Sequence, residues 1–302
     1  MRQTVLGLAA GLAAFLTWGL LPFYWKALSH VSAREILCHR MVWSFVFVGL
    51  VLTLQGRWRE LLNSISRQNL VYFGATSLLL SVNWLTYIWG VNAGYVLEAS
   101  MGYYINPLVN VLLGFVFFRD RLRPLQLAAI CLAAAGVLNL VINYGRFPWI
   151  ALTLAFTFGF YGLIRKVVRV ESLPGLFYET TLMSGPALAY LLFLNAGGGL
   201  RFWQVDLSTD LLLIGAGVAT SFPLLMFAFS ARRLRLVEVG IMQYLAPTCM
   251  FVLGAFVFRE PFTPVHLLSF LLIWSGVAVY VLELVWHFRA AIPRGLANKT
   301  NK

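Results

Sequence analysis

The chain has 302 residues, of which 60% are hydrophobic and only 11% are charged, and its formal net charge is +12. Soluble domains usually carry about 25% charged residues, whereas here apolar residues recur in long blocks along the whole chain. The composition therefore excludes a soluble enzyme, a nucleic-acid-binding domain and a disordered chain. It predicts a polytopic membrane protein embedded in the lipid bilayer.

Ten apolar blocks follow one another along the chain. A helix that crosses a bilayer needs roughly 20 mostly apolar residues, and evenly apolar blocks of this length predict helices instead of barrel strands. The expected fold class is therefore an all-α membrane protein with ten transmembrane helices. The predicted spans are 4–26, 35–54, 70–92, 97–118, 125–142, 149–164 with an extension towards Val168, 176–195, 211–231, 237–258 and 265–288.

Lys and Arg residues are distributed unequally between the loops. With the chain start in the cytoplasm, 17 of the 23 fall in cytoplasmic segments and five on the other side, while Arg40 lies within the second span. Cytoplasmic loops carry an excess of Lys and Arg, so both termini are expected in the cytoplasm, including a short tail over 289–302. The basic charge then reflects this bias and attraction to anionic lipid, and no nucleic-acid partner is expected.

The sequence contains no recognisable metal, cofactor or catalytic motif. The three cysteines, Cys38, Cys131 and Cys249, lie in apolar blocks and form no Cys-x-x-Cys pair, which indicates neither a disulfide framework nor a zinc site. The chain has no His-Glu-x-x-His motif, no Gly-rich phosphate loop and no close carboxylate pair within a span. We therefore expect no cofactor, no metal and no enzymatic activity.

An internal repeat appears when the chain is shifted by 140 residues. The shift superposes Glu98 on Glu238 and Pro107 on Pro247, and further matches are Tyr104 on Tyr244, Gly114 on Gly254, Arg119 on Arg259 and Gly136 on Gly276. Each half contains five spans, so the second half enters the membrane inverted, as in many secondary transporters. The sequence predicts two inverted five-helix repeats, over 1–143 and 144–288. The alternative is a duplication that serves only folding.

Several of these motifs resemble a known family. They are Gly7–Lys26 with Trp18-Gly19 and Pro22, Glu35-Ile-Leu-Cys-His39-Arg40, Gly102-Tyr-Tyr-Ile-Asn106-Pro107 with Gly114, and Glu179-Thr-Thr. The chain resembles the EamA family of the drug/metabolite transporter superfamily over essentially its whole length, and within it the RarD (chloramphenicol-sensitive protein) subgroup. The resemblance implies two five-helix repeats around a central cavity, in a bacterial inner membrane, moving small metabolites or amino acids.

Three ionisable residues within the spans are candidate functional groups. His39 and Arg40 lie about one turn into the second span, and Glu179 falls on His39 under the shift of 140. A charge at the bilayer centre costs about 2.5–3.5 kcal/mol on insertion scales, so each requires a reason. One titratable group near each mouth suits proton coupling. The alternative is that Arg40 extends to the interface and the others hydrogen-bond to neighbouring helix ends.

Polar residues on one face of the fourth span form a second candidate group. Tyr103 and Asn106 share a helical face, and Pro107 removes a backbone hydrogen bond near the middle of the membrane. The ninth span repeats the pattern with Gln243 and Tyr244 before its own proline. Transporters often bind ligands at such interrupted helices. The alternative is a polar stripe that hydrogen-bonds between helices.

Aromatic residues at mid-membrane depth form the third group. In the third span Asn83 and Tyr87 share a face, Trp84 is adjacent, and Trp18 lies near the middle of the first span. These residues could line an aromatic cavity, because aromatic faces attract cationic and aromatic ligands. The alternative is packing or anchoring at the membrane interface.

The predicted function is secondary transport of a small-molecule substrate, with export of small metabolites or amino acids by alternating access and with protons as a hypothetical coupling partner. The competing classes are an intramembrane lipid-modifying enzyme, a channel and a non-transporting membrane sensor.

Overall fold

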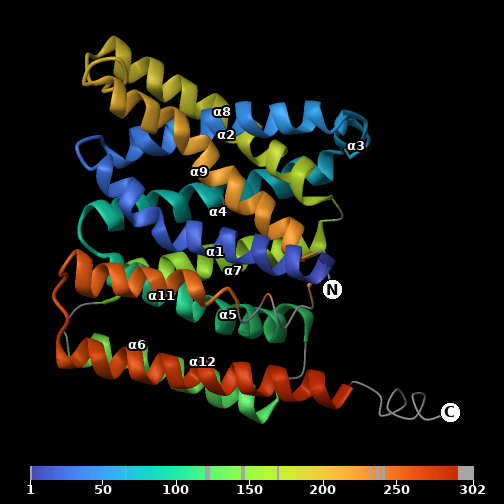
Figure 1. Cartoon of the computed structure of the whole chain (residues 1–302), viewed down its shortest axis with the longest axis vertical. Coiled ribbons are helices and arrows are strands. Elements are labelled where there is room, and N and C mark those ends of the chain that lie inside the picture. Colours follow the sequence, from blue (N-terminus) through green and yellow to red (C-terminus); the bar gives the residue numbers. More distant parts are fainter. Residues whose placement is uncertain are drawn as a thin grey trace.

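The computed structural model consists of helices joined by loops (Figure 1). It describes residues 2–64, 66–119, 123–143, 147–168, 170–231, 233–234, 239 and 242–291, and these ranges contain no strand. Glu238 and the predicted tail from 292 onwards lie outside them. The helices are α1 (Arg2–Ala27), α2 (Ala33–Leu54), α3 (Trp58–Asn63), α4 (Arg67–Asn92), α5 (Val96–Phe118), α6 (Pro124–Asn143), α7 (Trp149–Val167), α8 (Ser172–Ala196), α9 (Leu207–Ala231), α11 (Leu245–Val252), the π-helix η1 (Leu253–Val257) and α12 (Pro264–Ala291).

Every predicted span corresponds to one helix, apart from 237–258, where α11 and η1 occupy the described part. The short helix α3 follows the second span and was not predicted. Eight helices are long and apolar enough to cross a membrane: α1, α2, α4, α5, α6, α7, α9 and α12. The chain is therefore an all-α, multi-pass membrane protein. Small and polar residues lower the hydropathy of α8, and the apolar stretch Leu245–Val257 is shorter than a full span.

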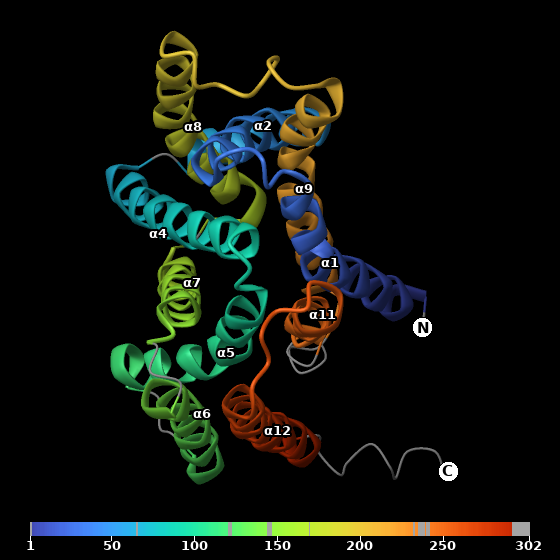
Figure 2. The same ribbon diagram turned by 90° about the vertical axis from the view of Figure 1, so that its left-hand side faces the viewer.

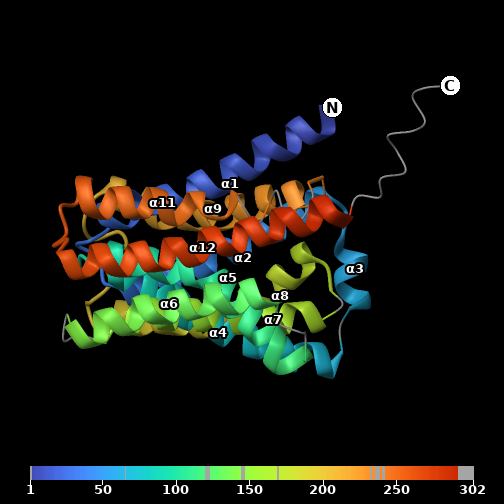
Figure 3. The ribbon, with the colours of Figure 1, turned by 90° about the horizontal axis from the view of Figure 1, so that it is seen from below.

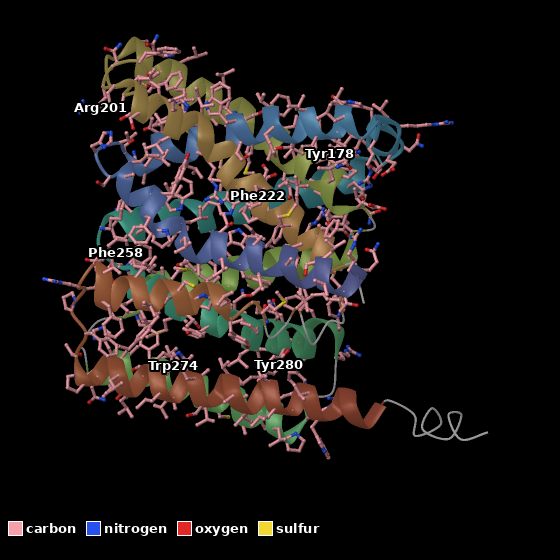
Figure 4. The ribbon with its side chains drawn as sticks, viewed as in Figure 1. Tyr178, Arg201, Phe222, Phe258, Trp274 and Tyr280 are labelled. Atoms are coloured by element: carbon pink, nitrogen blue, oxygen red, sulfur yellow. The ribbon has the colours of Figure 1, made fainter. Side chains whose placement is uncertain are left out.

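The long helices run roughly side by side between two ends of the molecule. α1 begins and α12 ends at the same end, as both Figure 1 and Figure 3 show. Arg201, between α8 and α9, and Phe258, directly after η1, lie at the opposite end (Figure 4). We call these the N-terminal end and the far end of the bundle.

The packing of the helices repeats itself between the two halves of the chain. Figure 2 shows α1, α9 and α11 on one side and α4 and α7 on the other. α5 packs on α7 as α11 packs on α1, and α4 packs on α7 as α9 packs on α1. The remaining main contacts are α4 with α8, α9 with α2, α6 with α12, α2 with α8 and α5 with α11. Matching α1, α2, α4, α5 and α6 with α7, α8, α9, α11 and α12 leaves this set of pairs unchanged. The smaller contacts of α4 with α2 and of α5 with α6 and α12 have no counterpart of similar size.

Close helix approaches at two glycines show the same correspondence between the two halves of the chain. A Cβ atom on Gly19 would lie 2.6 Å from Cβ of Cys249, and one on Gly159 would lie 2.9 Å from Cγ1 of Val109. Gly159 and Cys249 each follow their counterparts, Gly19 and Val109, by 140 residues. Glycine lets neighbouring helices approach closely in membranes, so equivalent crossings in the two halves use equivalent glycines.

Carboxylates fasten helix beginnings at the far end of the bundle. The two carboxylate oxygens of Glu260 accept the backbone N–H groups of Val96 and Leu97, at 2.7 and 2.8 Å, where α5 begins. Glu98, in the first turn of α5, accepts the N–H of Ile150 at the start of α7, at 2.9 Å. These bonds satisfy N–H groups that a helix leaves unpaired in its first turn, and they connect segments far apart in sequence.

An ion-pair cluster connects loops at the N-terminal end. Arg57, between α2 and α3, binds Glu60 at 2.5 Å and Glu171 at 2.6 Å. The pKa of the Arg57 guanidinium is raised above its ordinary value, mainly by the hydrogen bond with Glu60 and further by the hydrogen bond and charge of Glu171. The cluster is largely exposed, so its contribution to stability is small; its effect is to connect the α2–α3 loop with the residue before α8.

Candidate functional site

A cavity of about 140 Å³ lies among the helices and is partly open to the outside. Its walls come from α1, α2, α4, α5, α7, α8, α9 and α11, with one residue just before α11, and no described residue of α6 or α12 contributes. The lining residues of α1, α4, α7 and α9 come from the middle part of each helix or near it.

Eight of the eleven residues predicted from the sequence line this cavity: Trp18, Arg40, Asn83, Trp84, Tyr87, Tyr103, Asn106 and Gln243. The structure thus gathers residues from three separately predicted groups around one space. The other three, His39, Glu179 and Tyr244, are not among its lining residues.

His39 lies on a different face of α2 from Arg40. Its Nδ1 accepts a hydrogen bond from Nε1 of Trp43 at 3.3 Å, and its ring packs against Phe202 with the centroids 4.6 Å apart. Only 4% of the residue is exposed. Consecutive residues of a helix point about 100° apart, which is why one of the pair faces the cavity and the other faces the loop before α9.

Glu179 and Tyr244 lie behind the cavity wall. The carboxylate of Glu179 is fully buried in α8 and accepts a hydrogen bond from the hydroxyl of Tyr161, at 3.4 Å. Tyr161 itself lines the cavity, so Glu179 is one hydrogen bond away from it. Tyr244 stacks on Tyr104 instead, with the ring centroids 6.3 Å apart.

Asn83 and Asn106 both line the cavity and both hold α7 in place. The amide Nδ2 of Asn83 donates to the carbonyl of Leu154 at 3.0 Å, and that of Asn106 donates to the carbonyl of Ala155 at 3.0 Å. The two amides therefore attach α4 and α5 to adjacent carbonyls of one helix. For Asn106 this bond is the alternative of hydrogen bonding between helices. Oδ1 of Asn83 has no partner among the described residues.

Arg40 is the only charged residue in the described lining of the cavity. It is 4% exposed, and its guanidinium carbon lies 4.0 Å from the ring centroid of Trp84 and 5.3 Å from that of Trp25. Cation–π contacts of this kind stabilise a desolvated arginine by about 2 kcal/mol or more. They explain how an arginine is tolerated inside the bundle without extending to the interface.

The sequence interpretation missed part of the lining: Phe15, Leu21, Leu80, Phe158, Tyr161, Leu176, Thr220, Leu224, Ala246 and Met250. A usable signal was present. Six pairs of lining positions are separated by 140 residues: Trp18 with Phe158, Leu21 with Tyr161, Leu80 with Thr220, Trp84 with Leu224, Tyr103 with Gln243 and Asn106 with Ala246. Adding 140 to the predicted positions Trp18 and Trp84 would have found Phe158 and Leu224.

A central cavity among membrane-spanning helices is typical of membrane transporters, and comparison with known proteins assigns the family. The profile of the EamA-like transporter family matches residues 5–142 and again residues 148–282. The chain therefore belongs to the EamA-like transporter family.

Curated relatives align with nearly the whole chain. The uncharacterized transporter YojE of Bacillus subtilis is 43% identical over 293 residues, covering 96% of this chain and 98% of that protein. The protein RarD of Escherichia coli is 40% identical over 289 residues, covering 95% and 98%. A protein of Pseudomonas aeruginosa named chloramphenicol-sensitive protein RarD is 30% identical over 301 residues, covering 98% and 100%.

A solved crystal structure supports the fold independently. It superposes with a TM-score of 0.57 at 20% sequence identity, and the match covers 91% of this chain and 97% of that chain. At this identity the likeness concerns the fold alone. The family match and the apolar helices establish a helical membrane transporter.

Proposed function

We propose that this chain is a secondary transporter with ten membrane spans, arranged as two inverted five-helix repeats over 1–143 and 144–288. α8 and the stretch Leu245–Val257 supply the two spans beyond the eight that hydropathy identifies. Their outward side chains support this assignment, because Phe193 of α8 and Phe256 of η1 are each 71% exposed, as expected for residues in contact with lipid.

The observation that carries the proposal is the composition of the cavity wall. Lining positions occur in pairs separated by 140 residues, such as Tyr103 with Gln243, so both repeats contribute equivalent positions to one central space. Inverted repeats around a central site provide two similar conformations, one open to each side of the membrane, and this is the physical basis of alternating access.

We further propose that the protein exports small metabolites or amino acids across a bacterial inner membrane, with both termini in the cytoplasm. α1 begins and α12 ends at the same end of the bundle (Figure 1), which agrees with an even number of spans. The Lys and Arg distribution supports a cytoplasmic location of that end. Export of small metabolites is supported by the family resemblance of the sequence.

Counterflow in proteoliposomes tests the transport function. Purified protein is reconstituted with an unlabelled compound inside, and uptake of the labelled compound is measured for a panel of amino acids and small metabolites. Counterflow requires no ion gradient, so the coupling mechanism does not affect the result. Transient accumulation of a labelled compound is expected. If folded protein accumulates none of the panel, while a known carrier in parallel liposomes does, the carrier function for those compounds is wrong.

Proton coupling is a second part of the proposal. Glu179 is buried one hydrogen bond from the cavity through Tyr161, which would let a proton and a substrate act on the same group. We expect Glu179→Gln to abolish acceleration of uptake by an imposed pH gradient while counterflow persists. We expect His39→Ala to weaken the same response. Unchanged pH-driven uptake in both variants would exclude these residues as coupling sites.

A further inference from the structure

Arg40 has neither a counterion nor a full set of hydrogen-bond partners among the described residues. Nε and Nη1 of its guanidinium have no hydrogen-bond partner among the described residues, although the residue is 96% buried. The ion pairs found in the described part of the chain involve Arg57 and Arg123. A buried donor without a partner costs free energy, and a buried charge without a counterion costs more.

The surroundings of Arg40 keep its charge in place without neutralising it. Trp25 and Trp84 hold the guanidinium through their ring faces, and a ring face offers no full counter-charge. No acidic side chain lines the described part of the cavity. The field next to Arg40 is therefore positive and attracts an anion there, while the carboxylate of Glu179 lies behind the wall at Tyr161.

The rest of the wall is suited to an apolar body. Phe15, Trp18, Leu21, Leu80, Phe158 and Met250 line the same space, and they offer a ligand aliphatic and aromatic contacts. Oδ1 of Asn83 and the hydroxyl of Tyr87, which have no partner among the described residues, add two neutral polar groups. A carboxylate accepts hydrogen bonds from arginine N–H groups with charge assistance, whereas the described wall contains no carboxylate to receive an ammonium group.

Building on the proposed transport function, we propose that the substrate is an organic monoanion, with a carboxylate bound by Arg40 and an apolar or aromatic body that lacks a free ammonium group. This narrows the proposed substrates from metabolites and amino acids in general to carboxylic acids without a basic amine. Arg40 is the group that selects for the negative charge.

A matched series of compounds tests this substrate class. Purified protein is titrated at pH 7 with 3-phenylpropanoate, its neutral amide 3-phenylpropanamide, the cation 3-phenylpropylamine and zwitterionic L-phenylalanine, which share one aromatic body. Affinity is taken from ligand-dependent thermal stabilisation. We expect 3-phenylpropanoate to bind roughly tenfold or more tightly than the other three, because hydrogen bonds to charged groups are worth that much.

Two substitutions in the same helix identify the responsible residue. Arg40→Gln is expected to remove the preference for the carboxylate, and Arg40→Lys to retain part of it, since lysine keeps the charge. Arg34→Gln, at an exposed position near the start of α2, is the matched control and is expected to keep the full preference. The comparison of the four compounds on the wild-type protein stands even if an Arg40 variant fails to fold.

The outcomes separate the substrate class from the transport function. Equal or tighter binding of the amide, the amine or phenylalanine overturns the substrate class, as does a carboxylate preference that survives Arg40→Gln, or no binding of 3-phenylpropanoate by folded protein. Counterflow of labelled 3-phenylpropanoate is measured alongside. Preferential binding of 3-phenylpropanoate without its accumulation in counterflow supports the anion site and contradicts the carrier function. Accumulation of phenylalanine in place of the monoanion supports the carrier function and contradicts the anion site.

Discussion

Trp84→Ala is expected to lower the counterflow rate at least roughly tenfold. Trp84 is 7% exposed and lies 4.0 Å from the guanidinium of Arg40. Truncation removes a cation–π contact worth about 2 kcal/mol and leaves a space in the cavity wall, so the guanidinium loses the surface that orients it. The measurement is the initial rate of counterflow for whichever compound the wild-type protein accumulates.

The same rate measurement on two further variants distinguishes a specific role from general damage. Trp84→Phe keeps an aromatic face of smaller size and is expected to retain an intermediate rate. Trp203→Ala removes a tryptophan that is 72% exposed in the loop before α9, and it is expected to leave the rate unchanged. Wild-type rates in Trp84→Ala would contradict the role of this ring in the cavity.

Gly276→Leu is expected to destabilise the protein by about 3 kcal/mol. A Cβ atom at this position of α12 would lie 2.7 Å from the carbonyl oxygen of Ala129 in α6, which is backbone and cannot rotate away. The helices would have to separate, and overpacking of this kind costs about 1–3 kcal/mol or more. The apparent melting temperature of the purified protein in detergent measures the effect.

A matched substitution controls for the insertion of a leucine into a helix. Gly185, within α8, has no atom near the position of an added Cβ, so Gly185→Leu is expected to change the melting temperature little. Gly136→Leu, on the α6 side of the same contact, offers a second test, because a Cβ atom on Gly136 would lie 2.8 Å from the carbonyl oxygen of Ser269. Similar melting temperatures for Gly276→Leu and Gly185→Leu would show that α6 and α12 are not closely packed at this crossing.

The helices were predictable because hydropathy reports directly on contact with lipid. The described boundaries of α2, α4 and α5 differ from the predicted spans by three residues or fewer. The predicted span 176–195 misses the first turn of α8, because Ser172, Pro174 and Gly175 are not strongly apolar. Helix α3 was missed because a six-residue helix in a loop lacks both the length and the apolar content of a span.

The residues of the candidate site were predictable where a polar side chain lies in an otherwise apolar span. Arg40, Asn83 and Asn106 stand out in apolar spans, and all three line the cavity. Polarity alone does not say which way a side chain faces, so it grouped His39 with Arg40 although only Arg40 lines the cavity. Apolar lining residues such as Leu80 carry no such signal, because leucine also occurs on the exposed face of the same helix, as at Leu78.

The two walls of the cavity are equivalent in position but unequal in chemistry. The position 140 residues after Arg40 holds Thr180, and Trp84 and Asn106 correspond to Leu224 and Ala246. The guanidinium of Arg40 therefore has no charged counterpart from the second half in the described lining. A ligand held by Arg40 would also keep one fixed orientation relative to the two halves, whichever side of the membrane the cavity faces. The two proposed halves thus bring different chemistry to the same cavity, and the charge comes from the first of them.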